Sequence, residues 1–267
     1  MEYLGSLGRL VPLRCASAEG MSFGPRYSTR TTVEGVRRAQ LVPAQPRTWD
    51  VSWDLAYTGE VAALSGFADG AWGAGPWHWV PIQAHQGNLL TPREASLVDF
   101  VPASYWAGSG PVTDAEGQLV PRSLTVSLAS GWAAPWRDIP VLPGRRVTWA
   151  ADVAGTDGPA LAMAFFDAEG VQVAGFYGTS RAGAGARRVS MSATPPSLAA
   201  SVRVGVQPAV SVLTRPQVTW TTGQVPFSRG HGCRSAVLDG FEESLLDAAD
   251  QRRGAFTAHQ FTVMEVA

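Results

Sequence analysis

Alternation of apolar and polar side chains is the dominant pattern along this chain. Within residues 47–55 the apolar side chains occupy every second position, and threonine, serine and aspartate fill the positions between them. Successive side chains of a β-strand point to opposite faces, so this period predicts a strand with one buried face. The apolar positions of this strand are Trp49, Val51, Trp53 and Leu55. The same alternation predicts strands within 122–128, 145–153, 187–193, 201–206 and 259–266.

Turn and helix signals interrupt these strands. Residues 160–176 predict a hairpin, because two apolar runs meet at an Asp-Ala-Glu-Gly turn in which Gly170 tolerates a positive φ. A helix is predicted from Thr58, a suitable N-cap, to Gly70, which favours its end. A further turn or two of helix is expected within 239–253.

The character of the sequence changes between two parts. Residues 1–90 and 226–267 hold all four histidines and the helical pattern, whereas 91–225 is a nearly unbroken series of short strands. The C-terminal stretch is too short to bury a core alone, so it must pack on the N-terminal part. We therefore predict a mainly all-β fold: a discontinuous β-sandwich with one short helix, formed by 1–90 and 226–267, and a second β-sandwich, 91–225, inserted into it.

Composition excludes several classes of protein. Hydrophobic residues make up 45% of the chain and charged residues 16%, which suits a folded protein with a substantial core. The net charge of −1 predicts no nucleic-acid binding. The chain has no run of 18 apolar residues, so no membrane span is predicted. All 21 basic residues are arginine, so chemistry that depends on lysine is excluded. Cys15 and Cys233 are too few for a disulfide framework; free buried thiols are expected, and the alternative is one bridge between them if the chain ends meet.

Catalytic and metal-binding patterns are missing from the sequence. The histidines, cysteines and carboxylates show no metal-ligand spacing, so neither a metal nor any other cofactor is predicted. Asp50 and Asp54 share one face of a strand, but four residues of strand separate them by roughly 13 Å, too far for a glycosidase acid–base pair. We expect a protein that is not an enzyme.

Three segments resemble the distal-tail or minor-tail proteins of siphophages that infect actinobacteria. They are GSLGRLVPL near the N-terminus, RTWDVSWDLAYTGEVAALSGFADGAWGAGPWHWVP, and the closing GCRSAVLDGFEESLL with FTAHQFTVMEV. The inserted part, with IPVLPGRRVTWAADV, LAMAFFDAEGVQV and RRVSMSATPPSLAASVRVGV, is similar to jelly rolls of the carbohydrate-binding-module type. Together the two resemblances cover nearly the whole chain.

The tail-protein resemblance implies a structural role in the virion. Such a protein is assembled in the host cytoplasm and forms a cyclic ring, of six copies or a multiple of three, between the tail tube protein and the tip or hub proteins. The jelly-roll resemblance implies a domain that decorates this ring and contacts host cell-wall glycan. The alternative is a lectin-like module whose main task is glycan adhesion, and a glycan-active enzyme is the third reading.

Five of the ten tryptophans lie between Trp49 and Trp79. The strand pattern places Trp49 and Trp53 in a core. The remaining three, Trp72, Trp77 and Trp79, lie in a Gly/Pro-rich loop that enters a short strand, and packing on the helix or on a neighbouring subunit fits them better than a sugar platform. We predict that they contact another subunit, together with the loop 71–81 and the segment 21–30, because a large apolar surface marks a partner site.

Sugar binding in the inserted part requires exposed aromatic rings. Trp149 and Trp220 alternate within strands and are expected in the core, whereas one of the adjacent Phe176 and Tyr177 is expected to face out. The alternative is that the aromatic rings in loops cover the ends of the sandwich or are buried at a contact. The candidate carbohydrate-binding residues, which lie in loop-like contexts, are Tyr105, Trp106, Trp132 and Trp136.

Overall fold

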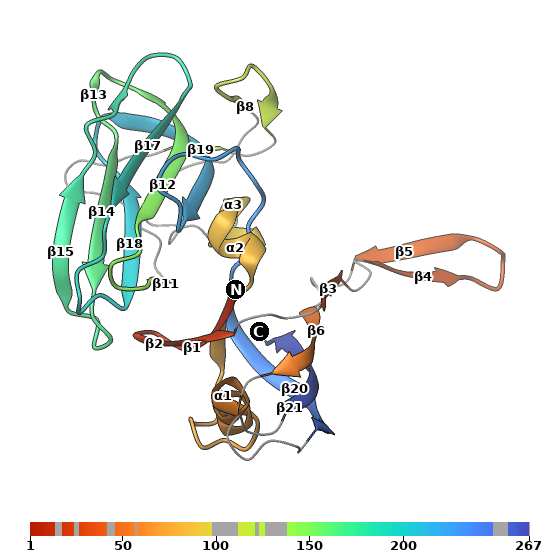
Figure 1. Cartoon of the computed structure of the whole chain (residues 1–267). Helices are drawn as coiled ribbons and strands as arrows, with labels where there is room; N and C mark the ends of the chain where they lie inside the picture. The colour runs from red at the N-terminus through yellow and green to blue at the C-terminus, as the bar shows by residue number, and fades with distance from the viewer. Residues whose placement is uncertain are drawn as a thin grey trace. The chain divides into compact units, whose positions relative to one another are not determined.

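The computed structural model divides into two compact units (Figure 1). Unit 1 comprises Met1–Glu2, Val11–Trp79 and Arg234–Ala267, and unit 2 comprises Tyr3–Leu10 and Val80–Cys233. The fold is mainly β, as the alternating sequence pattern predicts. No helix among the described residues is long and apolar enough to cross a membrane. The structure describes residues 1–13, 18–23, 27–41, 46–56, 58–97, 112–120, 123–125, 138–247 and 256–266.

Unit 1 is built on an antiparallel sheet in which β7, β20, β21, β6 and β3 are neighbours in that order. A separate two-stranded hairpin of β4 and β5 and one helix complete its described elements. The elements are β3 (Ala18–Phe23), β4 (Tyr27–Thr31), β5 (Arg37–Leu41), β6 (Arg47–Ala56), α1 (Thr58–Ala68), β7 (Trp77–Val80), β20 (Cys233–Asp247) and β21 (Phe256–Glu265).

One face of this sheet carries the core of unit 1. Trp49 of β6 is buried and meets Trp79 of β7 edge-on, with 6.5 Å between the ring centroids. Helix α1 packs through Phe67, whose ring lies 5.2 Å from that of Trp77. The predicted helix is confirmed: it begins at Thr58, and the chain leaves it through Gly70, whose φ is +80°.

The expectation of a helical turn within 239–253 is wrong for 239–247. These residues continue strand β20, which pairs with β21 through a bulge near Gly240. Phe241 stacks on His259 of β21 at 5.5 Å, so ladder hydrogen bonds and ring packing outweigh the helix-forming residues of this stretch. The remainder of the stretch, 248–253, lies outside the described residues.

Unit 2 is a β-sandwich of two four-stranded antiparallel sheets, β10-β19-β12-β17 and β11-β18-β14-β15 (Figure 1). Trp149 joins the sheets, because its indole donates a hydrogen bond to the carbonyl of Gly205 at 3.0 Å. The sandwich strands are β10 (Leu124–Thr125), β11 (Ile139–Pro140), β12 (Val147–Gly155), β14 (Leu161–Phe166), β15 (Gln172–Tyr177), β17 (Arg187–Ala193), β18 (Ser201–Val206) and β19 (Val210–Thr219). Shorter elements of unit 2 are β1 (Glu2–Ser6), α2 (Ile82–Gln86), α3 (Pro92–Ala95), β8 (Val112–Thr113), β9 (Leu119–Val120), β13 (Gly158–Pro159) and β16 (Arg181–Ala182). Strand β2 (Arg9–Leu13) begins in unit 2 and ends in unit 1.

The hairpin predicted at 160–176 is confirmed as β14 and β15, which span 161–177. Its turn is held by Asp167, whose carboxylate accepts hydrogen bonds from the backbone amides of Glu169 at 3.1 Å and Val171 at 2.8 Å. Gly170 has a φ of +81°, as the turn requires. The strands predicted at 187–193 and 201–206 coincide with β17 and β18.

The core of unit 2 extends beyond the sandwich strands. Tyr3, Val80, Leu89 and Leu90 are buried in the same hydrophobic cluster as Trp149. The predicted division of the chain, with 1–90 and 226–267 in one domain and 91–225 in the other, stays a prediction. The structure places the change between units at Trp79/Val80 and at Cys233/Arg234.

Two polar clusters hold the chain of unit 2 around this extended core. Asn88 is buried, and its amide donates hydrogen bonds to the carbonyls of Pro216 at 3.0 Å and Ser228 at 3.1 Å. Arg145 donates a 2.6 Å hydrogen bond to the hydroxyl of Tyr3 and lies over the ring of Trp220 at 5.1 Å. These hydrogen bonds satisfy the side-chain amide of Asn88 and the hydroxyl of Tyr3, as burial of a polar side chain requires.

Candidate functional site

The outer face of the sheet β10-β19-β12-β17 carries a buried network of charges. Asp152 of β12 is only 2% exposed. It forms ion pairs with Arg215 at 2.8 Å and with Arg188 at 3.1 Å. Arg215 also pairs with Asp114 at 2.9 Å and with Glu116. The alternation in 147–153 places Asp152 away from the inner core, but residues around β8 and β9 cover it.

The backbone at Arg215 is adapted to this network. Its φ of +47° lies in the left-handed region that residues other than glycine seldom adopt, and the β12–β19 register shifts at the same place. Burial lowers the pKa of Arg215, but the charges of Asp152 and Glu116 raise it by a larger amount. The pKa is therefore raised overall. Burial is the main influence on Arg188, and it lowers the pKa of this guanidinium despite the neighbouring Asp152.

The three carboxylates of this network lie close enough to hold a cation. Oxygen atoms of Asp114, Glu116 and Asp152 all lie within 4.8 Å of one another. The guanidinium of Arg215 nevertheless contacts each of the three carboxylates and supplies the positive charge that a metal would bring. We therefore interpret the cluster as an ion-pair network that closes the outer face of the sheet.

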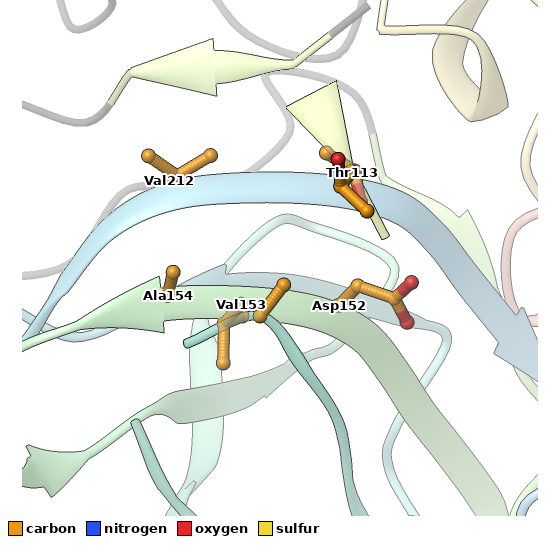
Figure 2. A pocket seen from close by; sticks show the side chains of 7 residues that line it. Thr113, Asp152, Val153, Ala154 and Val212 are labelled. Atoms are coloured by element: carbon orange, nitrogen blue, oxygen red, sulfur yellow. The ribbon is translucent and has the colours of Figure 1, made fainter. Parts of the chain in front are cut away.

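A small pocket lies beside Asp152 on the same face. Figure 2 shows the side chains of Asp152 and Ala154 along β12, with Val212 and Thr113 beyond them. The pocket has a volume of about 190 Å³, whereas pockets for small-molecule ligands have roughly 300–1,000 Å³. Its lining is mostly apolar, so it is a poor candidate for catalysis. The lining residues are Thr113, Asp152, Val153, Ala154, Ala186, Val212 and Thr214.

The outer face of the other sheet, β11-β18-β14-β15, is the better candidate for a binding surface. Register sets which side chains share it: Tyr177 is opposite Ala162, which is opposite Gly205, and in the next row Ala164 is opposite Arg203. Met163 and Phe165 alternate with these residues and point into the core. Small side chains therefore occupy the middle of this face, and larger ones stand at its margins.

An aromatic ring and a polar pair are the accessible groups of this face. Tyr177 is 72% exposed on the edge strand β15. Two inter-strand spacings away, Arg203 donates hydrogen bonds to both carboxylate oxygens of Asp138, at 2.6 and 3.2 Å. The guanidinium lies 4.0 Å from the centroid of the Phe166 ring. We call Tyr177, Phe166, Arg203 and Asp138 the β15 face.

The β15 face retains unused hydrogen-bonding capacity. The guanidinium has five N–H donors and uses two toward Asp138, and its face lies over the Phe166 ring. Side-chain exposure of Arg203 is 34% and of Asp138 is 22%, which leaves both accessible. The neighbouring hydroxyl of Ser201 is buried and has no hydrogen-bond partner. Such a surface can stack against an apolar ring face and bond hydroxyl groups beside it.

The structure separates the three tryptophans predicted at a subunit contact. Trp72 is 52% exposed and stacks on Phe67 at 5.7 Å. Trp77 is buried at 7% exposure and Trp79 is fully buried, so within unit 1 both serve the core. Of the three, Trp72 alone offers substantial surface to another subunit, because the other two rings are already covered by their own chain.

The predicted sugar-binding aromatics lie outside the described residues. These are Tyr105, Trp106, Trp132 and Trp136, and they stay predictions. Trp149 and Trp220 are buried, as expected. Of the adjacent pair, Tyr177 is the more exposed, whereas Phe176 is 40% exposed and turns its ring edge to Phe165.

Sequence reasoning missed Arg203 and Asp138. Asp138 lies 65 residues before Arg203, and only the pairing of β11 with β18 brings them together. A weak signal was present: Arg203 interrupts the apolar run SVRVGV at an outward position of a strand. A charged side chain there either meets solvent or has a partner.

Comparisons with known proteins give fold likeness at low similarity. No protein-family model matches the chain, and no curated protein matches it in sequence. Among solved structures, the enzymatically active domain of bacteriophage CBA120 tailspike protein 4 is 16% identical, with a TM-score of 0.35 over 49% of this chain and 21% of that chain. The CBM22-1 xylan-binding domain of Paenibacillus barcinonensis Xyn10C is 12% identical, with a TM-score of 0.32 over 50% of this chain and 96% of that domain.

A third match involves the CBM22-1–GH10 modules of Clostridium thermocellum xylanase 10B in complex with xylohexaose. It is 17% identical, with a TM-score of 0.34, and covers 47% of this chain and 28% of that chain. The chain thus spans about a quarter of the length of this enzyme fragment and of the tailspike domain.

Proposed function

We propose that this chain is a structural component of a phage tail tip whose second unit binds a glycan of the host surface. The observation that carries the glycan-binding half is the β15 face, where an exposed tyrosine ring and an accessible Arg203–Asp138 pair share one side of a sheet. The tail-tip half is supported by the resemblance of the N-terminal and C-terminal segments to distal-tail proteins.

The chemistry of the β15 face suits a neutral sugar. A pyranose presents an apolar face of C–H groups and a rim of hydroxyls, and a tyrosine ring packs against the former while its own hydroxyl meets water. Arg203 and Asp138 offer donors and acceptors side by side, which matches adjacent hydroxyl groups. Because each charge of the pair neutralises the other, a neutral ligand fits better than an anionic one.

The described features of unit 2 do not favour a catalytic role. The pocket beside Asp152 is small, and Asp152, the one carboxylate that lines it, is engaged by Arg215 and Arg188. On the β15 face, one carboxylate and one guanidinium neutralise each other, which leaves no acid–base pair of carboxylates there. We propose that the chain binds glycan without cleaving it.

A glycan array tests the binding half with the full-length chain. Wild type should bind at least one neutral cell-wall glycan, and Tyr177→Ala should lose that binding while its thermal unfolding is unchanged. Leu198→Ala is the matched control, because Leu198 is 71% exposed and lies in a turn outside the face. If Tyr177→Ala binds as well as Leu198→Ala, the β15 face is not the glycan site.

A further inference from the structure

The hairpin of β4 and β5 is well formed but has little packing of its own. Its turn is closed by Thr32, whose carbonyl accepts from the Gly35 amide and whose amide donates to the Val36 carbonyl, both at 2.9 Å. From Thr29 to Arg38 every side chain is exposed except Thr32, which is half-buried. Two-stranded hairpins are only marginally stable in water, so this one needs a further surface to order it.

The charges of the hairpin indicate the nature of that surface. Arg30 lies directly opposite Arg38 in the β4–β5 register, so two positive charges share one face. Like charges at opposed positions destabilise a strand pair. Neither arginine has an ion-pair partner among the residues that the structure describes. An acidic surface against this face would remove the repulsion.

Unit 1 itself presents such an acidic surface on its sheet. On the side opposite the core, Asp239 of β20 is opposite Thr262 of β21, which is opposite Asp50 of β6. Glu242 occupies the next outward position on β20, opposite Gln260. The three carboxylates are exposed, and the positions between them are uncharged. We call Asp50, Asp239 and Glu242 the acidic face.

We propose that the β4–β5 hairpin of one copy docks on the acidic face of a second copy of this chain. Both surfaces belong to the same protein, they are exposed, and their charges are opposite. Because the two surfaces differ, the contact is heterologous, and a repeated heterologous contact forms a ring where the rotation from copy to copy closes. The proposal rests on the assembling role given above and names the elements that join neighbouring subunits; it does not involve the β15 face.

Charge exchange tests the contact with the full-length chain. Variant A carries Arg30→Glu and Arg38→Glu, and variant B carries Asp239→Arg and Glu242→Arg. Each alone should associate at least about tenfold more weakly than wild type in sedimentation equilibrium, because attraction becomes repulsion. Mixed together, A and B should associate again, since the glutamate hairpin of A meets the arginine face of B and the arginine hairpin of B meets the carboxylates of A.

Two features make this test specific. Variant A keeps two like charges on the hairpin, so repulsion within the hairpin is the same as in wild type. Arg37→Glu is the matched control, because Arg37 is opposite Thr31 and lies on the other face of the hairpin; it should weaken association less than variant A. Association of wild type should also weaken in 1 M salt, where charges are screened beyond about 3 Å.

Three results would overturn the proposal: a wild type that stays monomeric at every concentration, a variant A that associates like wild type, or a mixture of A and B that stays apart. The glycan proposal is judged separately by the same samples. Variants A and B should bind the array glycan as wild type does, and Tyr177→Ala should associate as wild type does. If one proposal fails, the other can therefore still be tested with the same variants.

Discussion

The guanidinium of Arg215 lies 2.8 Å from the carboxylate of Asp152, on the outer face of a sheet whose inner face is the core of unit 2. Asp152 is 2% exposed and also holds Arg188. One carboxylate thus pairs with two guanidinium groups that arrive from different strands. The pair shows that the second unit is stabilised on both sides of this sheet, by apolar packing inside and by paired charges outside.

Asp152→Asn should destabilise unit 2 strongly. It leaves Arg188 and Arg215 with less negative charge in a buried position, and breaking a buried ion pair on one side costs about 3–5 kcal/mol. Chemical denaturation of the full-length chain measures the loss. Asp157→Asn is the matched control, because the ion pair of Asp157 with Arg181 is exposed to solvent; it should unfold like wild type. Equal stability of the two variants would contradict this role of Asp152.

Trp77→Ala and Trp72→Ala should show which tryptophan of the loop stabilises the fold and which one contacts another subunit. Trp77 is 7% exposed, so removing its ring should lower the free energy of unfolding by about 3–5 kcal/mol. Trp72 is 52% exposed, and its removal should cost much less in thermal unfolding while weakening any association through this loop. A Trp77→Ala variant that melts like wild type but fails to associate would restore Trp77 as a contact residue.

Acid should weaken unit 1 through Glu265. Burial raises the pKa of this carboxyl. Arg47 lowers it by a larger amount, through hydrogen bonds of 2.8 Å to each carboxylate oxygen and through its positive charge, so the pKa is lowered overall. The pair therefore stabilises the fold above the ordinary glutamate pKa of about 4.3, and the stabilisation is lost as the pH falls through the folded-state value. Glu265→Gln should cost about 1–2 kcal/mol at pH 7. Its difference from wild type should shrink as the pH falls below 4; a difference that stays constant would refute the linkage.

Fragment boundaries should follow the core rather than the change in composition. Residues 80–233 retain Val80, Leu89 and Leu90 in the hydrophobic cluster, whereas 91–225 lacks all three and also Asn88, which bonds the carbonyl of Pro216. We predict that the longer fragment melts cooperatively at a higher temperature than the shorter one. Equal melting temperatures would support the boundaries predicted from sequence.

Period-2 patterns predicted the strands of this chain well because burial of one face acts on every second residue. The runs 187–193 and 201–206 are strands at those very residues. The pattern says less about a face that other segments cover, which is why it did not reveal that Asp152 is buried. It also could not reveal Arg203 with Asp138, or Tyr3 in the core of the second unit, because such contacts depend on pairing between residues far apart in the sequence.

Isothermal titration of the glycan found on the array tests the central claim most directly. Full-length wild type should bind it, and Tyr177→Ala should bind at least about tenfold more weakly, since a ring that packs on a sugar contributes roughly 1.4 kcal/mol or more. Arg203→Met should weaken binding as well, because the hydroxyl groups lose their donors, whereas Leu198→Ala should match wild type. Full affinity in both Tyr177→Ala and Arg203→Met would contradict the assignment of the β15 face as the glycan-binding site.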